Sequence, residues 1–563
     1  MQIGIDLGTT NSLVAQLGKD GPRIIRNELG DDLTPSAVAL APDGSILVGR
    51  SARDQLVLTP DAGMAFFKRD MGTPATYTFG NREWSPTECS ATILRELRRI
   101  AEADCGETIT EAVITVPAYF HNSQRQATVD AANIAGLKVT RIINEPTAAA
   151  LAFGYQNPDR ESLLLVFDLG GGTFDVTLLE VFDGVVEIKS SAGESRLGGE
   201  DYTDALCSIL ILEHQFEIPD QERFVFRQKV EVAKRQLTTF EAVTVMWAGK
   251  EIQLTREDLA AASETFSGQI RQVVRRCLRD ARVTPDQLED ILLVGGTSRM
   301  PVISQFIQTE LGRAPNKGVD PDRVVAIGAA IQSALCHRNE AVQDLVLTDV
   351  SSHTLGIETA RQFASDVRAG WFTPLIDRNT TLPASRVQRF NTMHPSQDEV
   401  EVKVYQGEAR MVTDNRLIGS LTVRGLIARP GQKHPGEFDV RFTYDMNGIL
   451  EVEITNLQQE STTSKVFENR PGQMSEKEIA AAIKRLAPLK VHPRDFVANR
   501  ARLVRAERLY KELLGQSRDI LDHLLNDFEA ALEGQEPGLI DLLGAELDAF
   551  MNPYFRGEDQ MGS

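Results

Sequence analysis

The stretch Leu163–Thr177, which reads Leu-Leu-Leu-Val-Phe-Asp-Leu-Gly-Gly-Gly-Thr-Phe-Asp-Val-Thr, decides the fold. Its apolar run from Leu163 to Phe167 predicts a strand that is buried on both faces. The run ends in Asp168 and three glycines, which permit a tight turn whose backbone N–H groups can approach an anion. Carboxylates repel phosphate unless a divalent metal lies between them. The stretch therefore predicts a strand–turn–strand that holds a nucleotide phosphate and its magnesium, with a plain glycine hairpin as the alternative.

A second copy of this arrangement opens the chain. Residues Ile3–Ser12 read Ile-Gly-Ile-Asp-Leu-Gly-Thr-Thr-Asn-Ser, and a third glycine turn follows the apolar run at Ile291–Arg299. Two copies of strand, Asp-Leu-Gly and hydroxyl residues predict two similar lobes that face each other across one nucleotide. The sequence contains neither a Gly-x4-Gly-Lys-Ser/Thr loop nor a Gly-x-Gly-x-x-Gly fingerprint, which argues against the P-loop and dinucleotide classes.

Composition places the chain among globular proteins of several domains. It has 563 residues, 42% hydrophobic and 25% charged, with a formal net charge of −20, which argues against nucleic acid as a principal ligand. No apolar run reaches the roughly eighteen residues of a membrane span, and the early start of the first strand leaves no room for a signal peptide. The five cysteines are scattered without a Cys-x-x-Cys pair, as is typical of a reducing cytoplasm. We expect a cytoplasmic protein without membrane or nucleic-acid partners.

The three turns, in this order, resemble the phosphate and adenosine loops of the actin, hexokinase and heat-shock chaperone superfamily. Val113–Phe120 (Val-Ile-Thr-Val-Pro-Ala-Tyr-Phe) and Ile142–Leu151 (Ile-Ile-Asn-Glu-Pro-Thr-Ala-Ala-Ala-Leu) narrow the resemblance to the DnaK-type chaperones of the heat-shock protein 70 family. This resemblance covers residues 2 to about 470. Phe66–Arg69, Thr392–Pro395 and Pro493–Asp495 are similar to the short bacterial HscC type.

The resemblance implies the architecture. We expect an α/β actin-like ATPase of two ribonuclease-H-like lobes, followed by an antiparallel β-sandwich and a short α-helical lid. The expected domains are the ATPase at residues 1–340, a linker at 341–350, a peptide-binding sandwich at 351–470 and a lid with its tail at 471–563. Alternating apolar residues between 351 and 470 independently predict short strands.

The resemblance also implies a catalytic set. A lysine beside a turn is usually a solvated surface charge, but the lysine that matches Lys68 in the family reaches the γ-phosphate and the attacking water. Glu145, Asp168, Thr173 and Asp6 complete the set, and Asp6 and Asp168 are expected to touch magnesium through water. Pro146 predicts a helix from Thr147, directly after Glu145.

The implied cofactors are ATP or ADP and magnesium, with potassium as a further candidate ion. The segment Val230–Leu237 also fits a salt-bridged surface helix, whereas the resemblance has its charged residues clasp adenosine. Arg299 is expected to lie over the adenine ring. The implied nucleotide-binding residues are Gly8, Thr9, Thr10, Asn11, Gly170, Gly171, Gly172, Asp175, Gly198, Gly199, Glu231, Lys234, Arg235, Thr238, Gly295, Gly296, Ser298, Arg299 and Asp322.

Further positions are implied for signalling and for peptide binding. The apolar linker could dock in one nucleotide state and be freed in the other, or it could be an ordinary edge strand. The implied allosteric positions are Pro117, Arg125, Arg141, Asn144, Leu345, Val346, Leu347 and Asp349, of which Arg141, Asn144 and Asp349 match positions that engage a J-domain. The implied peptide-binding positions are Leu355, Ile357, Phe390, Met393, Val400 and Val402, which by periodicity alone would be sandwich core.

We therefore expect an ATP-dependent chaperone that binds unfolded, extended apolar peptides and works with a J-domain co-chaperone. The segment between Gly199 and Thr297 is shorter than the common DnaK pattern, which puts the use of a nucleotide exchange factor in doubt. The lid is also too short for the usual lid and helical bundle. A specialised chaperone with few clients, an actin-superfamily metabolite kinase and a nucleotide-sensing scaffold are the alternatives.

Overall fold

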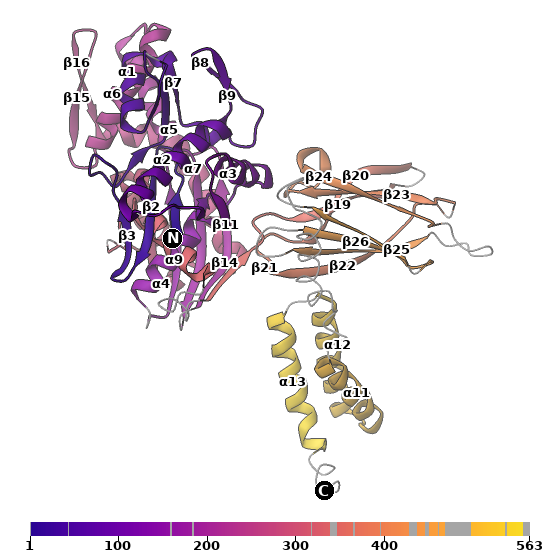
Figure 1. Cartoon of the computed structure of the whole chain (residues 1–563). Coiled ribbons are helices and arrows are strands. Elements are labelled where there is room, and N and C mark those ends of the chain that lie inside the picture. Colours follow the sequence, from indigo (N-terminus) through magenta and orange to yellow (C-terminus); the bar gives the residue numbers. More distant parts are fainter. Residues whose placement is uncertain are drawn as a thin grey trace.

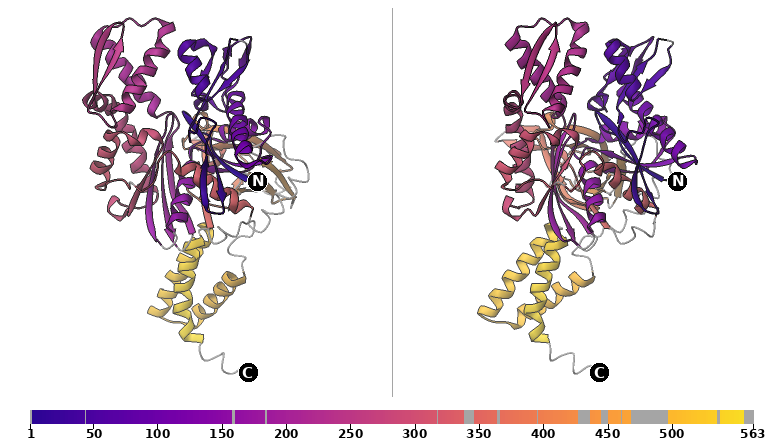
Figure 2. Two further views of the ribbon diagram at one scale, coloured as in Figure 1. Left: turned by 60° about the vertical axis from the view of Figure 1, so that its left-hand side comes forward. Right: turned by 90° about the vertical axis from the view of Figure 1, so that its left-hand side faces the viewer.

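The computed structural model describes residues 2–42, 44–157, 160–182, 185–316, 318–337, 346–363, 366–394, 396–426, 436–444, 450–459, 461–467, 497–534 and 537–555. Figure 1 shows two lobes at the N-terminal end, a sandwich beside them and a group of helices at the C-terminal end. Figure 2 shows from two further sides that the upper parts of the two lobes face each other.

The first lobe is built on a sheet of order β11-β10-β1-β2-β3. Its central strand runs parallel to β10 and antiparallel to β2. These strands are β1 (Gln2–Asp6), β2 (Asn11–Gly18), β3 (Gly21–Ile25), β10 (Glu111–Val116) and β11 (Lys138–Asn144). Ile3, Gly4 and Ile5 alternate between the two faces of β1 and are all buried, so both faces are covered, as continuous apolar runs predict.

The second lobe repeats this connectivity in a sheet of order β17-β12-β13-β14 that continues into β18 and β21. Strand β12 is parallel to β17 and antiparallel to β13, as β1 is to β10 and β2 in the first lobe. These strands are β12 (Ser162–Leu169), β13 (Phe174–Phe182), β14 (Val185–Glu194), β17 (Asp290–Val294), β18 (Val346–Val350) and β21 (Thr381–Leu382). The predicted strand–turn–strand at Leu163–Thr177 and the predicted repeat of the lobe are both confirmed.

Two apolar helices, α4 (Glu145–Gln156) and α9 (Val324–Cys336), share one core with strands of both sheets. The helices approach so closely that a Cβ at Gly328 would overlap the carbonyl of Ala148. Helix α4 begins at Glu145, earlier than the expected Thr147, because a helix tolerates proline within its first turn. This start places the Glu145 carboxylate at the helix N-terminus.

Outer parts rise from both lobes and contact each other. The first lobe contributes α1 (Arg50–Leu58) and the small sheets β5 (Ala37–Leu40) to β9 (Arg82–Trp84), and the second contributes α6 (Asp220–Gln236), β15 (Ala242–Trp247) and β16 (Lys250–Thr255). The remaining helices belong to the cores of the two large sheets: α2 (Pro86–Cys105) and α3 (Asn122–Ile134) in the first lobe, and α5 (Gly199–His214), α7 (Arg256–Asp280) and α8 (Pro301–Leu311) in the second. Phe224 of α6 packs on a first-lobe cluster that includes Ala52 and Leu56. The two lobes therefore touch above the cleft that separates them.

The sandwich consists of two four-stranded antiparallel sheets, β20-β19-β23-β24 and β22-β25-β26-β27. Their strands are β19 (Leu355–Phe363), β20 (Asp366–Ile376), β22 (Ala384–Asn391), β23 (Glu399–Gln406), β24 (Arg416–Arg424), β25 (Glu437–Tyr444), β26 (Leu450–Asn456) and β27 (Ser461–Phe467). Inward residues of both sheets form one core that includes Ile357, Val404 and Phe442. The predicted antiparallel sandwich is confirmed.

Among the residues that the structure describes, three helices follow the sandwich: α11 (Val497–Glu512), α12 (Gln516–Gly534) and α13 (Pro537–Phe555). They pack on one another through residues such as Leu509, Phe528 and Leu547. The segment Pro493–Asp495 and Leu345 lie outside the described residues, as does Pro395. In the part of the chain that the structure describes, no helix has the length and hydropathy needed to cross a membrane.

Candidate active site

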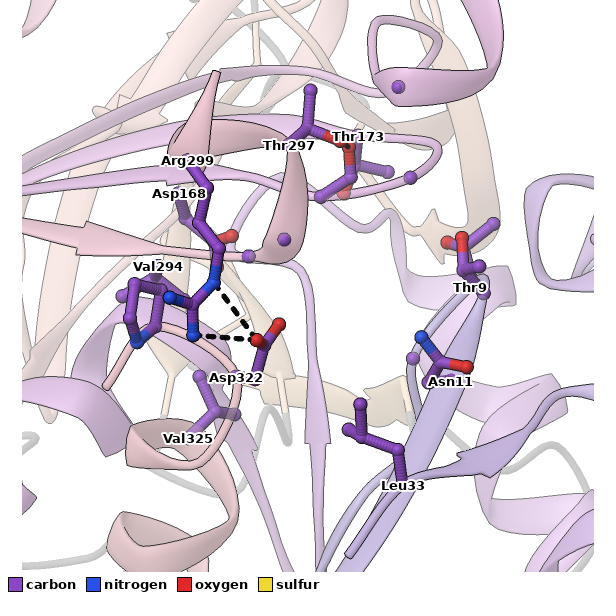
Figure 3. Close-up of a pocket in the computed structure, with 18 of the residues that line it drawn as sticks. Thr9, Asn11, Leu33, Asp168, Thr173, Val294, Thr297, Arg299, Asp322 and Val325 are labelled. Carbon is purple, nitrogen blue, oxygen red and sulfur yellow. Dashed lines mark hydrogen bonds and ion pairs between the residues drawn. The ribbon is translucent and has the colours of Figure 1, made fainter. Parts of the chain in front are cut away.

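A cavity of about 380 Å³ lies between the two lobes. Its floor is formed where the strands of both sheets end in their Asp-Leu-Gly turns. Figure 3 shows Thr9 and Asn11 of the first lobe on one side, and Asp168, Thr173 and Arg299 of the second lobe across from them. The cavity has the position that the repeated motif predicts for a nucleotide.

Most of the predicted catalytic and nucleotide-binding residues line this cavity. The lining includes Asp6, Gly8, Thr9, Thr10, Asn11, Lys68, Glu145, Asp168, Gly170, Gly171, Thr173, Gly199, Glu231, Lys234, Arg235, Thr238, Gly295, Gly296, Arg299 and Asp322. Four predicted residues are absent from the lining: Gly172, Asp175, Gly198 and Ser298. Two of them support the turns: Gly198 packs against the backbone of Gly171, and the fully buried Ser298 donates its hydroxyl to the carbonyl of Gly295 at 2.6 Å.

A buried ion pair in the cavity joins Lys68 of the first lobe and Glu145. The Lys68 Nζ lies 2.7 Å from Glu145 Oε1, and the side chains are 5% and 11% exposed. Lys68 also lies over the ring of Phe120 at 5.6 Å. The usual interpretation of a lysine beside a turn, a solvated charge, therefore does not hold for Lys68, whose ammonium is aimed into the cleft.

Three aspartates near this pair carry raised pKa values. Burial, together with the negative charge of Glu145, raises the pKa of Asp6 to about 7 and that of Asp175 to about 8. The same two causes raise the pKa of Asp168 well above its ordinary value. A low dielectric disfavours each additional negative charge, so these carboxylates need a cation to be ionised together.

A divalent cation fits this environment. Asp168 Oδ2 is buried and has no hydrogen-bond partner, although buried carboxylate oxygens normally find one. Among the described residues, no cluster of three or more acidic, histidine or cysteine side chains is arranged to hold a metal directly. Magnesium keeps much of its hydration and is often bound through few carboxylates plus phosphate oxygens. Asp6 and Asp168 therefore suit a magnesium ion that is held through water and by a nucleotide.

The glycine turns form a close-fitting cradle for phosphate. A Cβ at Gly8 would overlap the carbonyl of Asn11, and one at Gly171 would overlap the hydroxyl of Thr10. The first turn therefore folds closely on itself, and the turn of the second lobe contacts the Thr10 side chain of the first. Backbone N–H groups in such turns are suited to bind anions.

The planar guanidinium of Arg299 lines the cavity on the side of the second lobe. Arg299 donates from Nε and Nη2 to Asp322 Oδ2 at 3.0 and 2.7 Å, and from Nη2 to Asp320 at 2.6 Å (Figure 3). These bonds fix the orientation of the guanidinium plane, which can stack on a flat ring. The arrangement supports the predicted adenine contact.

Helix α6, also of the second lobe, contributes another part of the cavity wall through Glu231, Lys234 and Arg235. Glu231 accepts from Thr203 at 2.5 Å, and it is paired with Lys234 at 2.6 Å and with Arg235 at 2.7 Å. Burial would raise the pKa of Glu231, but Lys234 and Arg235 lower it to about 2. The charged residues of α6 thus form salt bridges with one another and also line the cavity, so the two interpretations of this segment are compatible.

Sequence reasoning missed several lining residues. They are mostly apolar or small residues from separate elements: Leu13, Leu33, Glu200, Val294, Thr297, Met300, Pro321 and Val325. Thr297 could have been found, since it belongs to the third glycine turn, and its hydroxyl donates to Gly170 at 2.8 Å. Val294 belongs to the same turn. Residues such as Leu33, Pro321 and Val325 carry no local pattern, because the cavity assembles them from distant parts of the chain.

Contacts across the mouth of the cleft join the outer parts of the lobes. Arg69 donates to both carboxylate oxygens of Asp201 at 3.0 Å. Phe66, which has a φ of 64°, lies under the guanidinium of Arg227 at 5.2 Å. We call these two contacts, together with the packing of Phe224, the cleft clasp. The clasp residues Phe224 and Arg227 lie seven residues before Glu231 and Lys234 respectively, so one face of α6 carries both the clasp and the cavity wall.

Three of the predicted allosteric positions, Arg125, Asn144 and Asp349, are joined by hydrogen bonds. Arg125 donates to Asn144 at 2.5 Å and to the carbonyl of Ala118 at 3.1 Å. Asn144 in turn donates to Asp349 at 3.4 Å. Asp349 lies in β18, whose backbone pairs in parallel with β14 between Val346–Thr348 and Val185–Glu187. Arg141 stands on β11, and Pro117 follows β10; the roles of these positions stay predictions.

The predicted peptide-binding positions divide into two groups. Leu355, Ile357 and Val402 are at most 2% exposed and belong to the sandwich core. Phe390 and Val400 are only partly buried against that core, and Met393 is 45% exposed. The accessible members are thus Phe390, Val400 and Met393, and the peptide contacts of all six stay predictions.

Comparisons with known proteins agree with this geometry. The family model described as "Hsp70 protein" matches residues 2–543. The chain is 41% identical over 497 residues to the "Chaperone protein DnaK" of Mycoplasma mobile, covering 85% of this chain and 80% of the relative. It is 39% identical over 501 residues to the protein of the same name from Thermotoga neapolitana, covering 85% and 82%.

Proposed function

The chain belongs to the Hsp70 family, and from this premise we propose that it is an ATP-dependent molecular chaperone. ATP binding and hydrolysis between the two lobes control the binding and release of extended apolar peptides by the sandwich. The fold is accordingly an actin-like ATPase followed by a β-sandwich and C-terminal helices. The comparisons do not support the alternative of a metabolite kinase.

One observation carries the proposed coupling. The sheet that ends in Asp168 and the phosphate turn continues through β13 and β14 into β18, the strand that leads to the sandwich. A change at the nucleotide can therefore bias the docking of β18 through a single sheet. A docked linker that is released in another state is a two-state element of the kind that allostery requires.

In the proposed hydrolysis, the chain's residues mainly position and stabilise charge. The glycine turns hold the phosphates, and the Lys68 ammonium faces the oxygens on which negative charge develops. Glu145, held by Lys68, orients the attacking water together with Thr173. Magnesium, bound through water by Asp6 and Asp168, would neutralise charge on the phosphates. Positioning and electrostatic stabilisation supply most of the rate enhancement in phosphoryl transfer.

The proposed signal leaves the cleft by two routes. One passes through Arg125, Asn144 and Asp349 to the linker. The other passes through helix α7, where Asp280 accepts from Arg378 of the sandwich at 2.8 and 3.1 Å. Arg378 also donates to Glu408 at 2.7 Å, which ties the sandwich loops to the second lobe.

The partners follow from the same premise. We propose that Phe390, Met393 and Val400 contact the peptide, and that a J-domain co-chaperone engages Arg141, Asn144 and Asp349. The domains would be residues 1–340, the linker 341–350, the sandwich 351–470 and the helical region 471–563. The five free cysteines support the cytoplasm as its compartment, and potassium stays a candidate second ion.

Single-turnover hydrolysis of ATP, with and without a short apolar peptide, tests this function. We expect the peptide to accelerate hydrolysis, because binding in the sandwich should favour the undocked state. An ATPase rate that is unchanged by the peptide and by a J-domain would contradict the proposal. Phosphoryl transfer to a sugar or to acetate would instead favour the metabolite kinase.

A further inference from the structure

Two histidines meet where the sandwich rests on the ATPase lobes. His353 follows β18 in the turn that enters the sandwich, whereas His121 precedes helix α3 of the first lobe. Their ring centroids are 4.6 Å apart, and the ring of Tyr119 lies 4.5 Å from that of His353. This aromatic contact joins the two parts of the molecule close to the linker.

The imidazole of His353 is enclosed without polar partners. The residue is 3% exposed, and neither of its ring nitrogens has a hydrogen-bond partner. Nδ1 of His121 is buried and unpartnered in the same way. A buried polar group without a partner costs free energy, and a buried unpaired charge costs far more. The docked arrangement therefore tolerates a neutral His353 but not an imidazolium.

The charges that act most strongly on His353 come from three elements and are all positive. They are Arg125 of α3, Arg276 of α7 and Arg416 of β24, besides His121 itself. Arg276 lies over the ring of Tyr119 at 5.3 Å, and Arg416 donates to the hydroxyl of Ser123.

The carboxylates nearby accept hydrogen bonds from other groups, although Oδ2 of Asp175 is buried without a partner. Asp175 accepts from the backbone N–H of Tyr119 at 3.2 Å. Glu408 is held by Arg378 and Thr354, and Asp349 accepts from Asn144. Burial first, and then these cations, lower the pKa of His353 well below its ordinary value, and burial also lowers that of His121.

We propose that His353 and His121 form a proton-sensitive latch, in which acidification releases the sandwich and linker from the ATPase lobes. The latch rests on the proposed coupling between these two parts. When the sandwich undocks, His353 becomes accessible and can bind a proton. In the docked state its enclosure disfavours protonation. The docked state thus binds fewer protons, and a falling pH favours undocking.

The size of the effect follows from linkage. An accessible histidine titrates near pH 6.5, so docking is unaffected well above that pH and weakens below it. For one proton, the docked-to-undocked ratio falls about tenfold between pH 7.5 and pH 5.5. Participation of His121 would steepen the fall.

Hydrogen exchange of the β18 backbone amides measures docking directly, after correction for intrinsic exchange rates. The full chain with saturating ATP is compared at pH 7.5 and pH 5.5, as wild type, His353→Gln, His353→Leu and His121→Gln. His337→Gln is the matched control, because His337 is partly exposed and already paired with Glu111 at 3.0 Å. Unaltered ATP affinity checks that each variant is folded.

We expect protection of β18 to fall about tenfold in the wild type and the control, and to stay constant with pH in both His353 variants. Protection that is independent of pH in the wild type would overturn the latch and leave the coupling intact. A pH dependence that survives in both His353 variants would also overturn it. An unprotected β18 in both ATP and ADP at either pH would overturn the latch and the proposed coupling together.

Discussion

Replacing Lys68 with alanine removes the cation that faces the carboxylates of the cleft. Its ammonium contacts Glu145 at 2.7 Å, and its charge lowers the pKa values of Asp6, Asp168 and Asp175. These pKa values are nevertheless raised, because burial and the charge of Glu145 outweigh Lys68. Without the lysine, nothing from this position would balance the charge that develops on the transferred phosphoryl group. We expect turnover to collapse while ATP still binds through the glycine turns and the adenosine walls.

The magnitude can be worked from the contact. A unit charge about 4 Å from the developing charge contributes about 4 kcal/mol at an effective dielectric constant of about 20. Each 1.36 kcal/mol corresponds to about tenfold in rate. The loss in the rate of the chemical step is therefore on the order of 10³-fold, similar to the loss of an oxyanion-hole donor.

Single-turnover hydrolysis measures the chemical step, and equilibrium titration with ATP measures binding. Lys138→Ala is the matched control, because Lys138 is an exposed lysine that also pairs with a glutamate, Glu111, at 3.0 Å. We expect the control to hydrolyse ATP at the wild-type rate. A Lys68→Ala protein with normal hydrolysis would refute the role, as would a defect that arises wholly from lost ATP binding.

Three further predictions concern release, docking and the metal. Phe224→Ala and Phe66→Ala should weaken the cleft clasp and accelerate ADP release severalfold without slowing the chemical step; displacement of a fluorescent ADP measures this, and unchanged release would argue against the clasp. Arg378→Ala should lower β18 protection in ATP by about tenfold, because hydrogen bonds to charged partners contribute about 1.5–3 kcal/mol; Arg389→Ala, which removes an exposed pair within the sandwich, should not. Asp168→Asn should raise the magnesium concentration for half-maximal hydrolysis at least about tenfold, and an unshifted magnesium titration would exclude Asp168 from the metal site.

The sequence predicts the parts of the site that depend on local pattern. The Asp-Leu-Gly-Gly-Gly run after an apolar strand predicts a turn that begins after Asp168, because only glycine permits so close a backbone approach. The same logic predicts the turn at Gly8. Pattern does not reveal which atoms of a turn reach the cavity, and the predicted residues Gly172 and Gly198 are not part of its lining. Gly198 packs against the backbone of Gly171, and Gly172 lies against the side chains of Thr9 and Arg69.

Other parts depend on contacts between distant residues. Leu33 and Val325 line the cavity, but each is an ordinary apolar residue in the sequence. Likewise, Leu355 and Ile357 are core residues of the sandwich by their burial, although the resemblance marks them for peptide. The meeting of His121 and His353 depends on how the sandwich docks, which no local pattern specifies.

The affinity for a short apolar peptide in ATP and in ADP tests the central claim most directly. Allosteric coupling typically amounts to about 1–3 kcal/mol, or roughly 5- to 150-fold in affinity. We predict that the dissociation constant of a fluorescent peptide is larger in ATP than in ADP by a factor within that range, and that replacing ATP with ADP restores tight binding. Equal peptide affinity with either nucleotide, in a protein that still hydrolyses ATP, would contradict the account.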